Sequence, residues 1–236
     1  MTSLAGCGGD LPVAVPQGPP AARHGERTLV EMTQVESARA ALVSASDLYA
    51  LERIAPARAH VRRGRELYLA QLGRGVRGRD RALHREVVAA FAAIDADLRG
   101  RAPLPAVRAR VAGLSGQLLD GVEGVLVPAA ARADAGARAE VLSRTLRALD
   151  DAYRAGVDGG KAREVERAYG LLARSQALAR GLADSLGPRK DAVLLTLSSA
   201  RMRAYPTGVA RPAAAAGEIG ARLARVREVL DERYAL

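Results

Sequence analysis

The residues best suited to chemistry lie on either side of one short turn, Val157-Asp158-Gly159-Gly160. Two amphipathic helices joined by such a turn pack antiparallel, so residues equally far from the turn face each other. This arrangement would bring together three acids and a tyrosine, namely Asp151, Tyr153, Glu164 and Glu166. Carboxylate and phenolate oxygens are ligands that ferric iron accepts. We therefore expect a candidate iron site here, with surface acids and a core tyrosine as the simpler alternative.

The other charges around this turn oppose tight metal binding. Arg154, Lys161, Arg163 and Arg167 are interspersed with the acids. Positive charge close to a site raises the free energy of adding a further cation. We therefore expect weak or no iron binding by the isolated protein, and the sequence indicates no other cofactor.

The turn interrupts the most regular stretch of the chain, residues 140–186. Apolar residues recur there every three or four positions, which places them on one face of a helix. One stripe comprises Leu142, Leu146, Leu149, Tyr153 and Val157, and the other Val165, Ala168, Tyr169, Leu172, Ala179, Leu182 and Leu186. The pattern predicts a helical hairpin.

Similar stripes recur along most of the remaining chain. The 236 residues include one phenylalanine and no tryptophan, so the core must come from Leu, Val and Ala. Such a core suits close-packed helices. We predict an all-α, antiparallel bundle of about eight helices, with two helical halves as a further expectation. The expected divisions are a tether at 1–27, a first half at 28–127, a linker at 128–137 and a second half at 138–236.

Local signals predict where individual helices begin, bend or become buried. Thr28 and Glu31 have the spacing of a capping box, and Asp80 is a good N-cap. Residues 193–202 are apolar on almost all sides, which predicts a deeply buried helix. One predicted helix carries four glycines, which indicate either close backbone approach or a bent helix. They are Gly113, Gly116, Gly121 and Gly124.

A basic segment, Gly73 to Arg79, reads GRGVRGR and contains the letters of a dinucleotide-binding fingerprint. We reject that interpretation, because the fingerprint follows a strand and here a helix precedes it. In a loop, the arginines would surround the N-terminus of the next helix, which favours anions. The candidate anion-binding residues are Arg74, Arg77, Arg79 and Arg81, with a solvated Arg/Gly loop as the alternative.

The N-terminal residues Leu4-Ala5-Gly6-Cys7 resemble the lipobox of bacterial lipoproteins, and a Gly/Pro-rich tether follows them. The resemblance implies lipid attachment at Cys7, a membrane anchor and an extracytoplasmic, envelope location. Six residues precede Cys7, so this interpretation requires a signal peptide that extends upstream of Met1. The alternative is a plain disordered tail.

Catalytic constellations are scarce in this sequence. It has three histidines, His24, His60 and His84, and it lacks the HExxH, CxxC and GxSxG spacings. With a single cysteine and no triad, we expect a non-enzymatic protein.

The formal net charge of +10 raises the question of an anionic partner. The arginines alternate with apolar stripes, as on solvated helix faces, which is the simpler interpretation. A nucleic-acid partner is disfavoured, because no aromatic platform accompanies the basic residues. No uninterrupted apolar run reaches the length of a membrane span.

Two stretches together resemble the helical extracytoplasmic domain attached to bacterial high-affinity iron permeases. The first stretch contains Asp151-Ala152-Tyr153, Val157-Asp158-Gly159 and Glu166. The second stretch contains, in order, Leu67-Tyr68-Leu69, the segment from Val76 to Leu83, Glu86, Phe91 and Pro103-Leu104-Pro105-Ala106-Val107. Two positions depart from that pattern: Gln71-Leu72-Gly73-Arg74 replaces an acidic pair, and Arg167 replaces a tyrosine. The resemblance implies an extracytoplasmic helical module that works beside a membrane permease in iron uptake.

Two functions are compatible with these observations. The first is an envelope-tethered binding or accessory protein, in iron or other metal uptake. The second is a structural or adaptor module whose arginine-rich faces bind an anionic surface or polymer, and binding of that kind is salt-sensitive.

Overall fold

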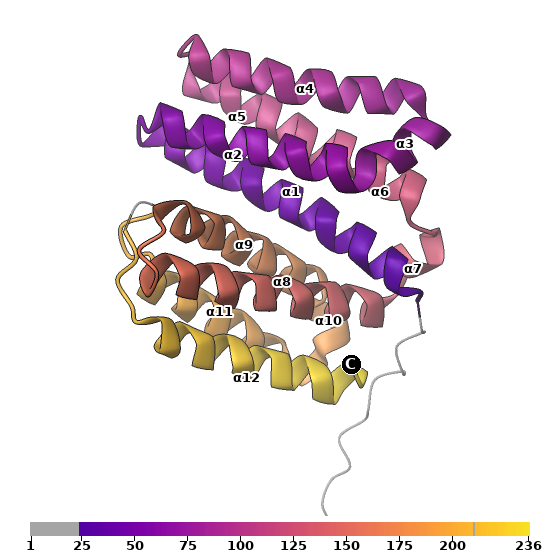
Figure 1. Cartoon of the computed structure of the whole chain (residues 1–236). Helices are drawn as coiled ribbons and strands as arrows, with labels where there is room; N and C mark the ends of the chain where they lie inside the picture. The colour runs from indigo at the N-terminus through magenta and orange to yellow at the C-terminus, as the bar shows by residue number, and fades with distance from the viewer. Residues whose placement is uncertain (1–23, 210) are drawn as a thin grey trace, which may run out of the picture.

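The protein is all-α, as predicted. The computed structural model describes residues 24–209 and 211–236, and these residues contain helices and no strand. They form two bundles stacked one upon the other (Figure 1). We call them the N-terminal bundle, α1 to α6, and the C-terminal bundle, α8 to α12.

The N-terminal bundle consists of four antiparallel rods, two of which contain a π-helical segment. The rods are α1 (Glu26–Ala50); α2 (Ile54–Leu67), a π-helix (Tyr68–Leu72) and α3 (Gly73–Arg79); α4 (Arg81–Arg99); and α5 (Leu104–Gly113), a second π-helix (Leu114–Leu118) and α6 (Leu119–Leu126). Rods consecutive in sequence pack together, and the fourth packs against the first. This is the up-down topology that short connections favour.

The C-terminal bundle repeats this arrangement. Its rods are α8 (Ala135–Val157); α9 (Ala162–Gly181), followed by the short α10 (Ala183–Leu186) and a 3₁₀ turn (Gly187–Arg189); α11 (Lys190–Ala204); and α12 (Ala216–Tyr234). The helix α8 packs against α9 and α12, and α11 closes the ring between them. The predicted hairpin is thus α8–α9, and both stripes are buried except Val157, which is partly buried.

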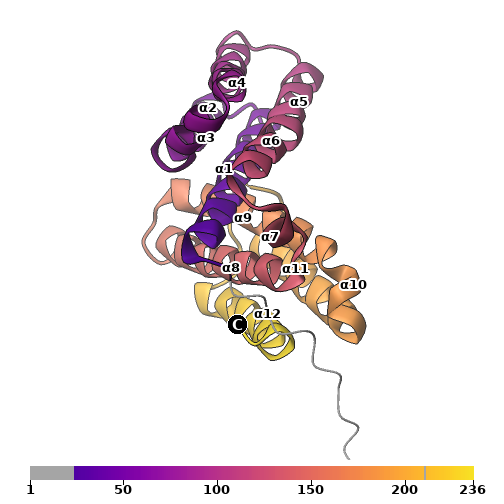
Figure 2. The ribbon, with the colours of Figure 1, turned by 90° about the vertical axis from the view of Figure 1, so that its right-hand side faces the viewer.

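The region predicted as a linker, residues 128–137, is mostly helical. It contains α7 (Ala129–Ala133) and the first turn of α8. The Asp134 carboxylate accepts a hydrogen bond from the N–H of Ala137 at 2.7 Å and so caps α8. The helix α7 lies at the junction of the two bundles (Figure 2).

Three local predictions differ from the structure. The capping box at Thr28 is wrong, because α1 begins at Glu26 with Gly25 as its N-cap and no side-chain cap. The burial predicted for residues 193–202 is wrong in part, because Leu195 and Met202 are 70% and 68% exposed. The segment 73–79 is the helix α3 and not a loop.

The glycines of α3 explain why its sequence is typical of a loop. A Cβ atom on Gly75 would lie 2.9 Å from Leu126 Cδ2, so the glycine lets α3 approach α6 closely. The next residue, Val76, is fully buried. Residues that usually mark a turn therefore serve here to pack two helices.

The glycines of the fourth rod have different surroundings. Gly113 and Gly116 lie at and within the π-helical segment, and a Cβ on either would meet nothing within 4 Å. Gly121 faces Leu83 of α4, with a Cβ position 3.3 Å from its side chain. The rod is thus irregular at its centre and closely packed further along.

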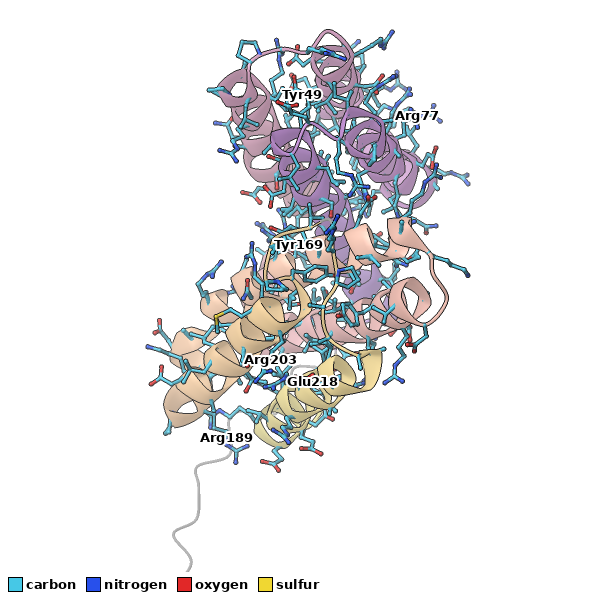
Figure 3. The ribbon with its side chains drawn as sticks, turned by 90° about the vertical axis from the view of Figure 1, so that its left-hand side faces the viewer. Tyr49, Arg77, Tyr169, Arg189, Arg203 and Glu218 are labelled. Carbon is cyan, nitrogen blue, oxygen red and sulfur yellow. The ribbon has the colours of Figure 1, made fainter. Side chains whose placement is uncertain are left out.

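The two bundles meet chiefly through α1 and α9. Ser44 of α1 donates a hydrogen bond to the carbonyl of Glu166 at 2.7 Å. The Tyr169 hydroxyl donates to Asp47 at 2.7 Å and accepts from Arg201 at 2.9 Å. Figure 3 shows Tyr169 where the two bundles meet. Polar bonds within a buried contact fix how the bundles sit on each other.

Four buried tyrosines should ionise late. Burial raises the pKa of Tyr68 to about 12, and it also raises the pKa values of Tyr153, Tyr169 and Tyr205 above the ordinary value of 10.0. Unfolded tyrosines ionise near pH 10, so this contribution to stability is complete below that pH and is lost as the pH rises through each folded pKa, which for Tyr68 is about 12. The protein has no tryptophan, so a pH titration of tyrosinate absorbance can follow these side chains. It should show four of the six tyrosines ionising above pH 10. Ionisation of all six tyrosines near pH 10 in a still helical protein would contradict this.

Candidate functional site

Three of the four arginines predicted to bind anions line one shallow hollow on the N-terminal bundle. Arg74 and Arg77 come from α3 and Arg81 from the start of α4, with Gly78 between them. All three are exposed, and within the described part of the chain none has a carboxylate within ion-pairing distance. Figure 3 shows Arg77 at the outer edge of this bundle. We call Arg74, Arg77 and Arg81 the arginine face.

The junction of α3 and α4 brings these side chains together. Arg74 and Arg77 are three residues apart, so they share one side of α3. Asp80 then adopts an extended conformation (φ −144°, ψ 97°), and α4 starts in a new direction at Arg81. The third guanidinium is therefore placed beside the first two.

The helix N-terminus itself is not free for an anion. The Asp80 carboxylate accepts a hydrogen bond from the N–H of Leu83 at 2.9 Å, which confirms Asp80 as the N-cap. A carboxylate at this position already neutralises the positive end of the helix dipole. Arg74, Arg77 and Arg81 lie near the start of α4, but its N-terminus is capped, so any anion must be held by the guanidinium groups.

Arg79 does not belong to the arginine face. Its guanidinium donates hydrogen bonds to the carbonyls of Val125 and Leu126, at 2.7 and 3.1 Å. These carbonyls end α6 and have no partner within the helix, so Arg79 caps α6. The predicted set of four is thus three surface arginines and one structural arginine.

The arrangement suits recognition of oxyanions. Each guanidinium presents a planar fork of N–H donors that matches two oxygens of a phosphate or carboxylate. Three such groups without acidic partners leave a local excess of positive charge. That charge favours a surface or polymer that presents several anionic groups side by side.

The four residues of the predicted hairpin metal site have different surroundings. Asp151 is exposed, and the Tyr153 hydroxyl donates to the carbonyl of Ala214 at 2.8 Å, toward α12. Glu164 pairs with Arg167 at 3.1 Å and with Arg63 at 3.6 Å. Tyr153 and Glu164 therefore face different neighbours.

Glu166 points toward the N-terminal bundle. It is 3% exposed, and its carboxylate lies 2.9 Å from Arg53 and 3.2 Å from His60 Nε2. The structure thus does not assemble the predicted ligands, because Glu166 joins the two bundles while Tyr153 binds the connection before α12. Among the described residues, no group of three or more His, Cys, Asp or Glu side chains is placed to hold a metal ion.

Sequence reasoning missed a second charged hollow, at the junction of the bundles. Its lining comes from five helices, α1, α6, α7, α8 and α9, and spans residues 32–178. No sequence pattern links positions so far apart, since only the packing of the bundles brings them together. The residues are Met32, Glu36, Arg39, Asp120, Glu123, Arg132, Arg138, Val141, Arg174, Ala177 and Leu178.

Two further observations bear on function. The predicted lipid-attachment residue, Cys7, lies outside the described residues, and no helix in the described part is long and apolar enough to cross a membrane. Comparison with protein families, curated proteins and solved structures finds no match to this chain. The resemblance to the permease-associated domain therefore stays an expectation from the sequence.

Proposed function

We propose that this protein is a non-enzymatic helical adaptor that docks on an anionic lipid surface through the arginine face. The observation that carries the proposal is the convergence of Arg74, Arg77 and Arg81, all exposed and without acidic partners in the described residues. The two bundles serve as a rigid support for this face. Anionic headgroups offer the repeated oxyanions that such a cluster fits.

The expected strength of this contact follows from its charges. A basic residue near an anionic bilayer contributes about 1 kcal/mol, so three contribute about 3 kcal/mol, or about a hundredfold in affinity. The attraction falls off within a Debye length and weakens with salt. Such binding is moderate and reversible, as a docking contact requires.

Vesicle sedimentation tests the proposal. The full chain should bind phosphatidylglycerol vesicles at low salt, bind them more weakly at high salt, and ignore phosphatidylcholine vesicles. The triple variant Arg74→Gln/Arg77→Gln/Arg81→Gln should lose about a hundredfold in affinity, because it removes the face without altering the core. Salt-independent binding, or undiminished binding by this variant, would refute the function.

The lipid anchor expected at Cys7 would complement this face. One lipid anchor and one basic patch together hold a protein on a membrane more firmly than either alone. With such an anchor, the protein would act as an envelope-tethered accessory in iron uptake beside a permease. Metabolic labelling with a fatty-acid analogue should mark the wild-type protein expressed with its upstream sequence. Equal labelling of Cys7→Ser would count against the anchor.

A further inference from the structure

The hollow between the bundles has a volume of about 410 Å³ and is lined mainly by charged residues. Arg39 of α1 lines this hollow and is only 5% exposed. The Arg39 guanidinium donates to the Ser115 carbonyl at 3.0 Å and pairs with Glu36, Asp120 and Glu123, the last at 3.3 Å. A buried guanidinium thus already occupies the space between three carboxylates.

A second arginine completes this network. Arg174 of α9 donates to the other oxygen of Glu36 at 2.7 Å. The network therefore holds two arginines and three carboxylates, every one of which has an oppositely charged partner. A metal cation would bind weakly here, because the carboxylates are already paired with guanidinium groups.

The remaining positive charge lies on two arginines that line the same hollow, Arg132 of α7 and Arg138 of α8. Neither has a hydrogen-bond or ion-pair partner in the described part of the chain. Arg132 is exposed and Arg138 is half-buried. Their charges therefore remain available to a ligand, and they bring the formal charge of the lining from −1 to +1.

Glycines on the neighbouring helices leave room for these side chains. A Cβ atom on Gly181, at the end of α9, would lie 2.3 Å from a terminal nitrogen of Arg138. The same position on Gly124 of α6 lies 4.0 Å from Arg132. One guanidinium thus lies beside α6 and the other beside α9, so a ligand with one anionic group would leave at least one unpaired.

We propose that this hollow binds a small anion with at least two carboxylate or phosphate groups, held by Arg132 and Arg138. Its volume is within the range of small-molecule sites. Two forked guanidinium groups can each engage one oxyanion, and the ion-paired network around Arg39 holds the neighbouring side chains in place. The hollow shares no lining residue with the arginine face, so the two sites are separate.

Titration calorimetry with citrate, pyrophosphate and acetate tests the proposal on the full chain. Citrate or pyrophosphate should bind at one site per chain, and acetate about tenfold more weakly or not at all. The tighter of the first two probes identifies the carboxylate or the phosphate class. Absence of saturable binding by both, or equal binding of acetate, would overturn the proposal.

Variants locate the site. Arg132→Gln/Arg138→Gln should weaken binding of the tighter probe about tenfold or more, because both charge-assisted contacts are lost. Gly181→Ala should weaken it as well, by displacing Arg138 without changing the charge. The control Arg163→Gln/Arg225→Gln removes the same charge from exposed positions elsewhere and should bind as the wild type does. Equal weakening by the control, or none by the first pair, would refute the site.

Discussion

Replacement of Gly170 by alanine is expected to destabilise the protein by about 3 kcal/mol. The new methyl group would lie 2.2 Å from the carbonyl oxygen of Ala40 and 2.5 Å from the hydroxyl of Ser44. The first of these is backbone of α1, which cannot rotate away, so α1 and α9 must separate. The loss outweighs the gain of about 1 kcal/mol that alanine brings to a helix interior.

Chemical denaturation of the variant and of a matched control measures this effect. Gly113→Ala makes the same change at a helical position where the new methyl group meets nothing within 4 Å. It should stabilise the protein by about 0.5–1 kcal/mol. Similar effects of the two substitutions would mean that the close approach of α1 and α9 is not as described.

Replacement of Arg39 by methionine is expected to cost about 3–5 kcal/mol near neutral pH. Methionine keeps much of the side-chain volume but leaves Glu36, Asp120 and Glu123 facing one another without their shared cation. Burial already raises the pKa of Glu123, and the charge of Arg39 holds that pKa down. Without Arg39 the pKa should rise further, so Glu123 protonates more readily in the folded variant.

The sign of the pH dependence follows from this shift. A carboxyl group whose folded pKa is raised favours the folded state more as the pH falls. The difference between variant and wild type should therefore shrink from about pH 7 to about pH 5. As a control, Arg58→Met breaks the more exposed pair with Asp95 and should cost clearly less. A pH-independent loss for Arg39→Met, or equal losses, would contradict the buried network.

The sequence predicts the helices well because each must bury one stripe. The stripes of α8 and α9 locate the hairpin, and Asp80 locates the start of α4. The prediction is wrong at α3. Glycines usually signal a turn, but here Gly75 lets α3 lie close to Leu126 of α6. Local composition cannot distinguish these uses, because the second depends on a helix about fifty residues away.

The candidate sites differ in how far apart their residues lie in the sequence. The arginine face comes from one short segment, so its members can be found by proximity in sequence. Arg79 cannot be separated from them, since its partners are the carbonyls of Val125 and Leu126. The hollow between the bundles depends on how five helices pack, which the sequence does not indicate. Tyr153 and Glu166 are separated because each contacts a different neighbouring element.

The most direct test of the proposed docking function compares two variants of equal net charge on phosphatidylglycerol vesicles. One is Arg74→Gln/Arg77→Gln/Arg81→Gln, and the other removes three exposed arginines without acidic partners in the described residues, Arg147, Arg163 and Arg225. If the arginine face docks the protein, the first variant should bind about a hundredfold more weakly than the second, which should stay close to the wild type. Equal weakening of both would show that only net charge matters and would contradict a defined docking face.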